Sequence, residues 1–192
     1  MKQNWLKNIT MSCLSVGDMQ ALGGLGLPID SVGLNAMSAD VHTPFSKYHG
    51  VAYSIPSGWI DFVDLTTLQE TTLHGRRSDI MLFGQGTARN CYVFVGMLDY
   101  LAFLGLRQFF PSVLPVLDRA DVFLLGGARK FFNLASTTDV YEQVGLFFPK
   151  SDFGGTMRRT MLARNPRHVV AYDGFYGEAR SLFEFYQHLR RN

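Results

Sequence analysis

The chain has 192 residues, of which 47% are hydrophobic and 18% charged, and its formal net charge is +2. The low charged fraction and high apolar fraction exclude a disordered chain and favour a large buried core. Such a small net charge does not by itself indicate nucleic acid as a partner, because the distribution of the charges decides that question.

Residues 1–85 are expected to form a small α+β extension. Helices are predicted over 17–22 and 28–37, with a glycine-rich loop between them and Pro28 near the start of the second helix. Segments 51–55 and 59–63 predict a hairpin of two strands, because Pro56, Ser57 and Gly58 between them favour a turn. A further short strand is predicted over 80–83.

Residues 86–192 alternate between apolar strands and helices. The predicted strands are 92–95, 121–125, 144–148 and 168–172, and the helices that follow them are 97–110, 128–135, 153–163 and 178–190. Continuous apolar strands are typical of a parallel sheet that is covered on both faces. The sequence therefore predicts an α/β domain in which helices flank a parallel sheet.

The two cysteines, Cys13 and Cys91, are too few for a disulfide framework or a four-thiolate zinc site. We expect Cys91 to be a small buried apolar residue at the start of a strand. The N-terminus lacks the apolar stretch of a signal peptide, and the longest apolar segment, 92–106, is too short to span a bilayer. These features predict a cytoplasmic protein with no membrane partner.

Ligands of an open parallel sheet bind beyond the carboxyl ends of its strands. The acidic residues near those ends are Asp99, Asp152 and Asp173. A magnesium site would normally place two or three carboxylates there. Asp152 is predicted to be the N-cap of its helix, which leaves few acids for chemistry. The histidine spacing indicates no metal site, and the context of the two cysteines indicates no nucleophile.

A group of basic residues follows the third predicted strand, and no acidic residue lies between positions 153 and 172. Its members are Lys150, Arg158, Arg159, Arg164 and Arg167. Arginine is well suited to pair with phosphate. The group is therefore either a solvated helix face or a contact surface for a nucleic-acid backbone.

The string from Cys91 to Leu104 resembles the first motif of toprim domains, in particular those of zinc-finger/toprim primase-like proteins of Bacteroidetes mobile elements. Segments 117–125, 145–154 and 176–186 continue the resemblance in order, and 27–30 and 50–63 resemble the region upstream. The chain has too few Cys and His residues for the zinc finger. The resemblance implies a toprim-like sheet and an ancestry in nucleic-acid chemistry.

The resemblance also implies where the family carries its catalytic groups. The family's catalytic glutamate falls on Val95, and its two metal-binding aspartates fall on Pro149 and Ser151. These side chains cannot replace carboxylates as ligands of a hard cation. The retained positions are those of the turns and the scaffold, namely Gly96, Asp99 and Gly154. The resemblance therefore favours the fold and disfavours catalysis.

Three functions follow as expectations. The favoured one is a catalytically degenerate, primase-related domain that needs no cofactor. It would act as a nucleic-acid-binding or assembly subunit of a mobile element, with the five basic residues on the DNA or RNA backbone. The second is an interaction module that exposes phenylalanines to a protein partner or to another copy, drawn from Phe109, Phe110, Phe131, Phe132, Phe183 and Phe185. The third is an active Mg²⁺-dependent primase or nuclease that uses Asp99, Asp152 and Asp173.

Overall fold

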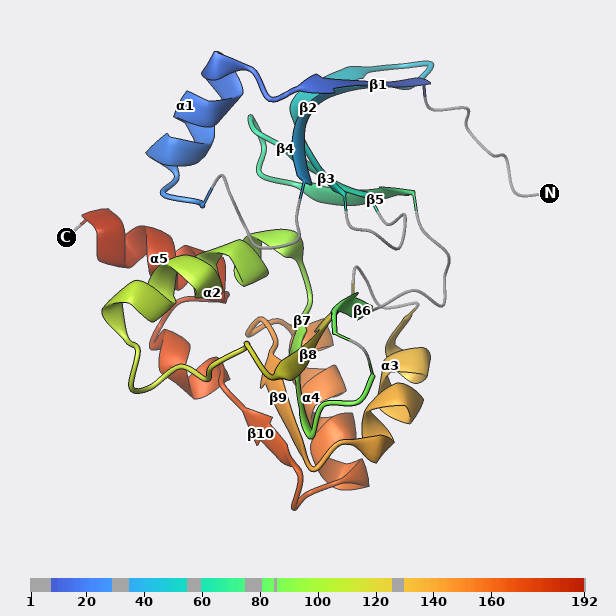
Figure 1. The fold of residues 1–192 in the computed structure, drawn as a ribbon, viewed down its shortest axis with the longest axis vertical. Coiled ribbons are helices and arrows are strands. Elements are labelled where there is room, and N and C mark those ends of the chain that lie inside the picture. Colours follow the sequence, from blue (N-terminus) through green and yellow to red (C-terminus); the bar gives the residue numbers. More distant parts are fainter. Residues whose placement is uncertain are drawn as a thin grey trace. The chain divides into compact units, whose positions relative to one another are not determined.

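The computed structural model describes residues 8–28, 35–54, 60–74, 81–84, 86–125 and 130–191. Its contacts divide the chain into two compact units, Met1–Gly75 and Arg76–Asn192, both drawn in Figure 1. Each unit contains one sheet. The strand near residue 81, which we grouped with the N-terminal extension, pairs within the second sheet. The domain boundary after residue 85 itself stays a prediction.

The first unit is a five-stranded antiparallel sheet in the order β1-β2-β3-β4-β5, and its described residues also form the helix α1. Its elements are β1 (Asn8–Cys13), α1 (Val16–Gly24), β2 (Asn35–His42), β3 (Lys47–Ser54), β4 (Ile60–Asp64) and β5 (Glu70–His74). The predicted helix at 17–22 and the predicted pairing of two strands as a hairpin are confirmed. The turn residues 56–58 lie outside the described residues.

The prediction of a helix over 28–37 is wrong for residues 35–37, which form the start of β2. Residues 29–34 of that prediction lie outside the described part of the chain. β2 pairs with β1 on one side and with β3 on the other. This pairing with partners distant in sequence overrides the weak local preference for a helix.

α1 is held to one face of the first sheet by a buried carboxylate. Asp18 in the first turn of α1 accepts hydrogen bonds from Ser15 Oγ and Ser38 Oγ. The ring of His49 lies between two carboxylates, with Nε2 2.9 Å from Asp18 Oδ1 and Nδ1 2.8 Å from Asp40 Oδ1. Carboxylates only accept, so both ring nitrogens donate when His49 is an imidazolium. The hydrogen bonds to Asp40 and Asp18 accordingly raise the pKa of His49.

The second unit contains a five-stranded sheet in the order β10-β9-β7-β8-β6. Its strands are β6 (Met81–Phe83), β7 (Asn90–Phe94), β8 (Ala120–Leu124), β9 (Gln143–Phe147) and β10 (Val169–Ala171). Its helices are α2 (Met97–Phe109), α3 (Phe131–Thr137), α4 (Asp152–Arg164) and α5 (Leu182–Arg191). Four strands run parallel, and β6 adds an antiparallel edge. The predicted parallel sheet with flanking helices is therefore confirmed.

Helices cover both faces of this sheet (Figure 1). Alternate residues of the parallel strands pack with α3 and α4 in one apolar cluster that includes Val93, Leu134 and Met157. The opposite face packs against α2, where the Phe103 ring lies 5.3 Å from Phe94 and 5.1 Å from Phe147 between ring centroids. α5 then packs on α2. Two-sided burial explains why these strands are uninterrupted apolar runs.

The last helix begins at Leu182, four residues later than the predicted start at 178. Residues 178–181 are not helical, and they follow a 3₁₀ helix over Asp173–Tyr176. Side chains cap the start of α5: Glu184 N–H donates to Ser181 Oγ at 3.1 Å, and Glu184 Oε2 accepts at 2.6 Å from Arg180 N–H, the residue before Ser181. The sequence contains this Ser-x-x-Glu spacing, which is a signal of a helix start that the prediction did not use.

Both cysteines are free thiols, Cys13 exposed and Cys91 buried. Burial raises the pKa of the Cys91 thiol far above its usual value. The prediction that Cys91 is a buried apolar residue is confirmed. Across the residues that the structure describes, no helix combines the length and the apolar character needed to cross a membrane.

Candidate functional site

A solvent-open pocket of about 440 Å³ lies at the carboxyl edge of the parallel sheet. It is lined by the turn after β9, the first two turns of α4 and the residue that opens the 3₁₀ turn after β10. The lining residues are Lys150, Ser151, Asp152, Gly155, Thr156, Arg158, Arg159 and Asp173. Ligands of open α/β sheets bind at this edge, so this pocket is the candidate site of the second unit.

Ser151 caps the helix that forms one wall of the pocket. Its backbone is extended, and its Oγ accepts a hydrogen bond from Gly154 N–H at 3.1 Å. The prediction that Asp152 is the N-cap is wrong, because Asp152 is already the first helical residue. Its carboxylate is exposed in the first turn, where it interacts favourably with the helix dipole.

Three of the five predicted basic residues line the pocket. Lys150 Nζ donates to Gly177 O, and Arg159 donates to Thr156 Oγ1 at 3.2 Å. Arg158 forms an ion pair with Asp173, which largely balances its charge. Among the described ion pairs, none engages Lys150 or Arg159, so these two cations give the pocket its positive character.

The other two basic residues lie away from the pocket. Arg164 is the last residue of α4 and pairs with Asp139 through two hydrogen bonds, of which Nε to Oδ1 measures 2.9 Å. Arg167 is exposed in the turn between α4 and β10, at the amino edge of the sheet. The predicted basic group is thus split between opposite ends of α4.

Of the three predicted acidic candidates, Asp152 and Asp173 line the pocket and Asp99 does not. Asp99 is buried in the first turn of α2, where its Oδ1 accepts a hydrogen bond from Phe183 N–H at 2.9 Å. Burial raises the pKa of Asp99 to about 6, although hydrogen bonds from Phe183, Ser181 and Leu182 oppose the shift. Asp99 therefore joins α2 to the start of α5.

The other residues that were matched to the toprim family have structural roles. Val95 is half-buried and packs against the core, and Gly96 is the N-cap of α2. A Cβ on Gly154 would lie 2.1 Å from the carbonyl oxygen of Pro149, so glycine is required where α4 meets this turn. No cluster of three or more His, Cys, Asp or Glu side chains suited to a metal ion occurs within the described ranges.

Sequence reasoning missed the Arg158–Asp173 ion pair and the place of Thr156 beside Arg159. The first pair joins a helix to the turn after a different strand, which local patterns do not reveal. A Thr-x-x-Arg spacing on a predicted helix places the two side chains on neighbouring turns. That spacing is a signal that could have found the second pair.

No family model and no curated protein matches the chain. Solved structures match its fold. The primase fragment of the bacteriophage T7 primase-helicase protein is similar with a TM-score of 0.51 and 15% sequence identity, over 93% of this chain and 70% of that chain. A second match has a TM-score of 0.44 and 16% identity, over 86% of this chain and 80% of that one. It comes from bacteriophage T7 lagging-strand DNA polymerase interacting with primase domains of two gp4 subunits bound to an RNA/DNA hybrid and dTTP.

At this identity the likeness concerns the fold alone. It agrees with the four parallel strands and with the helices on both faces of the second sheet. The second unit therefore has a toprim-like α/β fold, and the chain is similar in fold to the T7 primase fragment.

Proposed function

We propose that this chain is a catalytically degenerate, primase-related domain that binds the phosphate backbone of a nucleic acid, as a subunit of a mobile element. The observation that carries the proposal is the pocket at the carboxyl edge, where Lys150, Arg158 and Arg159 surround the start of α4. Backbone N–H groups at a helix start attract anions, and arginine pairs with phosphate through two parallel hydrogen bonds.

The donor set supports a site without metal. Val95 and Pro149 have no side-chain oxygen, and the Ser151 hydroxyl accepts from Gly154 N–H. Asp173 faces Arg158, and Asp152 is the other carboxylate in the pocket. Magnesium prefers several carboxylate and water oxygens in octahedral geometry, so these residues do not fit the ion that the resemblance would imply. The third function, an active Mg²⁺-dependent enzyme, is therefore not the one that we propose.

Reversing the charge of Arg159 is expected to weaken binding of a single-stranded oligonucleotide by about tenfold. It should also reduce by about one the steepness with which the logarithm of the binding constant falls with the logarithm of the salt concentration. Arg167→Glu is the matched control, because it makes the same charge change in an exposed arginine at the opposite edge of the sheet. Fluorescence anisotropy over a range of salt concentrations, with DNA and RNA, measures both effects. Equal weakening by the two variants would show that net charge alone acts, and no weakening by Arg159→Glu would reject the proposal.

A second candidate function is a protein-interaction module, and the exposed side chains of one segment favour it. Of the six phenylalanines named for a surface patch, Phe132 is 81% exposed and Phe109 is 58% exposed. Phe131 is buried, and the other three are half-buried, with Phe110 and Phe185 packed together on Phe175. Val140 on the 3₁₀ helix that follows α3 is exposed as well.

If the exposed side chains of Phe132 and Val140 form an interface for self-association, Phe132→Ser is expected to shift the protein from dimer to monomer. An exposed phenylalanine would bury apolar area on association. Light scattering after size-exclusion chromatography measures the mass. The exposed Phe109, changed to serine, is the control from another helix. A wild-type protein that stays monomeric at high concentration would contradict self-association through Phe132.

A further inference from the structure

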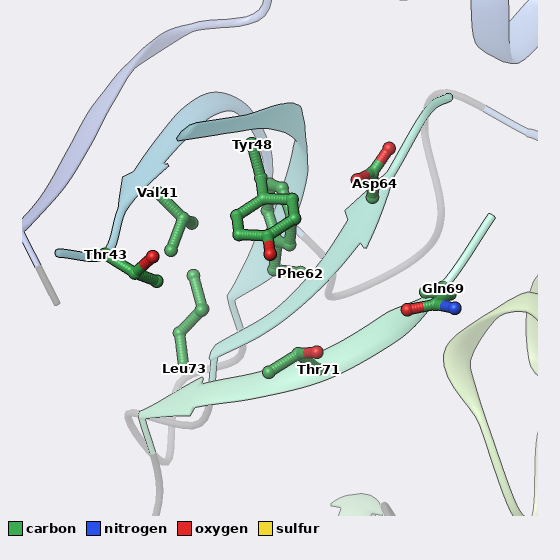
Figure 2. Close-up of a pocket in the computed structure, with 8 residues that line it drawn as sticks. All are labelled: Val41, Thr43, Tyr48, Phe62, Asp64, Gln69, Thr71 and Leu73. Carbon is green, nitrogen blue, oxygen red and sulfur yellow. The ribbon is translucent and has the colours of Figure 1, made fainter. Parts of the chain in front are cut away.

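A second pocket, of about 230 Å³, lies on the sheet of the first unit (Figure 2). It is lined by Val41, Thr43, Tyr48, Phe62, Asp64, Gln69, Thr71 and Leu73. All of these residues belong to one compact unit, and none belongs to the carboxyl-edge site. This volume is below that of pockets for drug-sized ligands, so the pocket has room for one small chemical group, such as a single ring.

The pocket lies on the face of the sheet opposite α1. Val41 is the register partner of Tyr48, and Phe62 is the partner of Thr71, so these side chains share a face. Ser38 of β2 and His49 of β3 are an odd number of residues from Val41 and Tyr48, so their side chains point to the other face, where they contact Asp18 of α1. α1 therefore does not cover the pocket.

The pocket combines an aromatic surface with a carboxylate. Tyr48 is 42% exposed, and Phe62, which lines the same pocket, is 4% exposed. Asp64 is 6% exposed, and its Oδ1 accepts hydrogen bonds from Thr66 N–H at 2.7 Å and Thr67 N–H at 3.0 Å. The turn after β4 thus fixes the carboxylate. None of the hydrogen bonds found among the described residues involves the second oxygen, Oδ2.

Polar side chains complete the rim. Figure 2 shows Thr71 on β5 and Gln69 just before that strand, on the side of the hollow away from Thr43. The Gln69 amide can donate and accept at once, and the Thr71 hydroxyl can do either. The Thr43 hydroxyl is instead used within the β2–β3 turn, where it donates to Ser46 O at 3.1 Å.

We propose that this pocket binds a nucleobase with an exocyclic amino group, such as cytosine or adenine. The base would stack on the Tyr48 ring, and its amino group would donate to Asp64 Oδ2. Uracil and thymine present a carbonyl where cytosine presents the amino group, and this carbonyl would face the carboxylate oxygen without a hydrogen. A ligand with only apolar or cationic groups would leave Gln69 and Thr71 unused. The inference extends nucleic-acid binding to the first unit and does not depend on the carboxyl-edge pocket.

The test compares cytidine with uridine, which differ at this group, by NMR titration of the ¹⁵N-labelled full chain. Cytidine is expected to shift amides of β3, β4 and β5 and to bind about tenfold more tightly than uridine. Asp64→Asn keeps an oxygen for the Thr66 and Thr67 amides but can offer N–H groups to the base. We expect this variant to lose the preference for cytidine. Tyr48→Ala is expected to weaken both nucleosides by about tenfold, whereas Tyr48→Phe keeps the ring and the binding.

Equal binding of cytidine and uridine, or shifts confined to other strands, would overturn the proposal. Displacement of cytidine by tetramethylammonium would assign the pocket to organic cations instead. Oligo(dC) and oligo(dT) then distinguish a base within a strand from a free nucleoside. The dC preference should survive Arg159→Glu and disappear with Asp64→Asn. Loss of the preference in Arg159→Glu would contradict the independence of the two sites.

Discussion

Replacing Gly154 by alanine is expected to lower the free energy of unfolding by about 3 kcal/mol, because the added Cβ has no room. It would lie 2.1 Å from the carbonyl oxygen of Pro149, a backbone atom that cannot rotate away. Relief would require moving either the turn after β9 or the Ser151 cap of α4. Both carry residues of the carboxyl-edge pocket.

Gly155 is the matched control, since it is the next residue of the same helix and a Cβ there meets nothing within 4 Å. Gly155→Ala is expected to stabilise the protein by up to about 1 kcal/mol through helix propensity. Urea unfolding followed by circular dichroism compares the two variants. If both changed stability by the same amount, the close approach of α4 to Pro149 would be wrong.

The buried carboxyl of Asp99 is expected to make stability fall as the pH rises from about 4 to about 6. Burial raises the pKa of Asp99 to about 6 in the folded protein, from 3.8 in the unfolded chain. The folded state therefore binds more protons than the unfolded state in this window, so increasing pH favours unfolding. Two pKa units correspond to a loss of at most about 3 kcal/mol.

Asp99→Asn removes the titrating group and keeps an oxygen that can accept from Phe183 N–H. We expect the variant to lose this pH dependence and to equal or exceed the wild type in stability at neutral pH. Asp152→Asn, at an exposed acid in the pocket, controls for the loss of one charge. Thermal unfolding across the acidic range provides the comparison. An unchanged pH profile in Asp99→Asn would show that Asp99 does not titrate as the buried contact requires.

The second unit could be predicted from sequence because its strands are buried on both faces and are visible as apolar runs. The first unit has weaker signals. β1 is exposed along its whole length, and β2 carries polar residues on the face that meets α1. Both strands are defined by their partners rather than by their own residues. Local patterns therefore found α1 and the β3–β4 hairpin and missed the rest of that sheet.

The candidate site was predictable in position and only partly in composition. The sequence placed Lys150, Arg158 and Arg159 after a strand end, where the pocket lies. It could not show that Arg164 pairs with Asp139, 25 residues earlier, or that Asp99 contacts Phe183, 84 residues later. Such long-range contacts decide which charged groups remain available to a ligand.

The decisive measurement is the affinity of a fluorescent single-stranded oligonucleotide for the wild-type chain, in EDTA and in millimolar Mg²⁺ at equal ionic strength. A backbone-binding pocket whose free cations are Lys150 and Arg159 predicts the same affinity in both buffers. Binding that requires Mg²⁺, and that Asp152→Asn or Asp173→Asn abolishes, would contradict it and assign the pocket to metal-dependent chemistry.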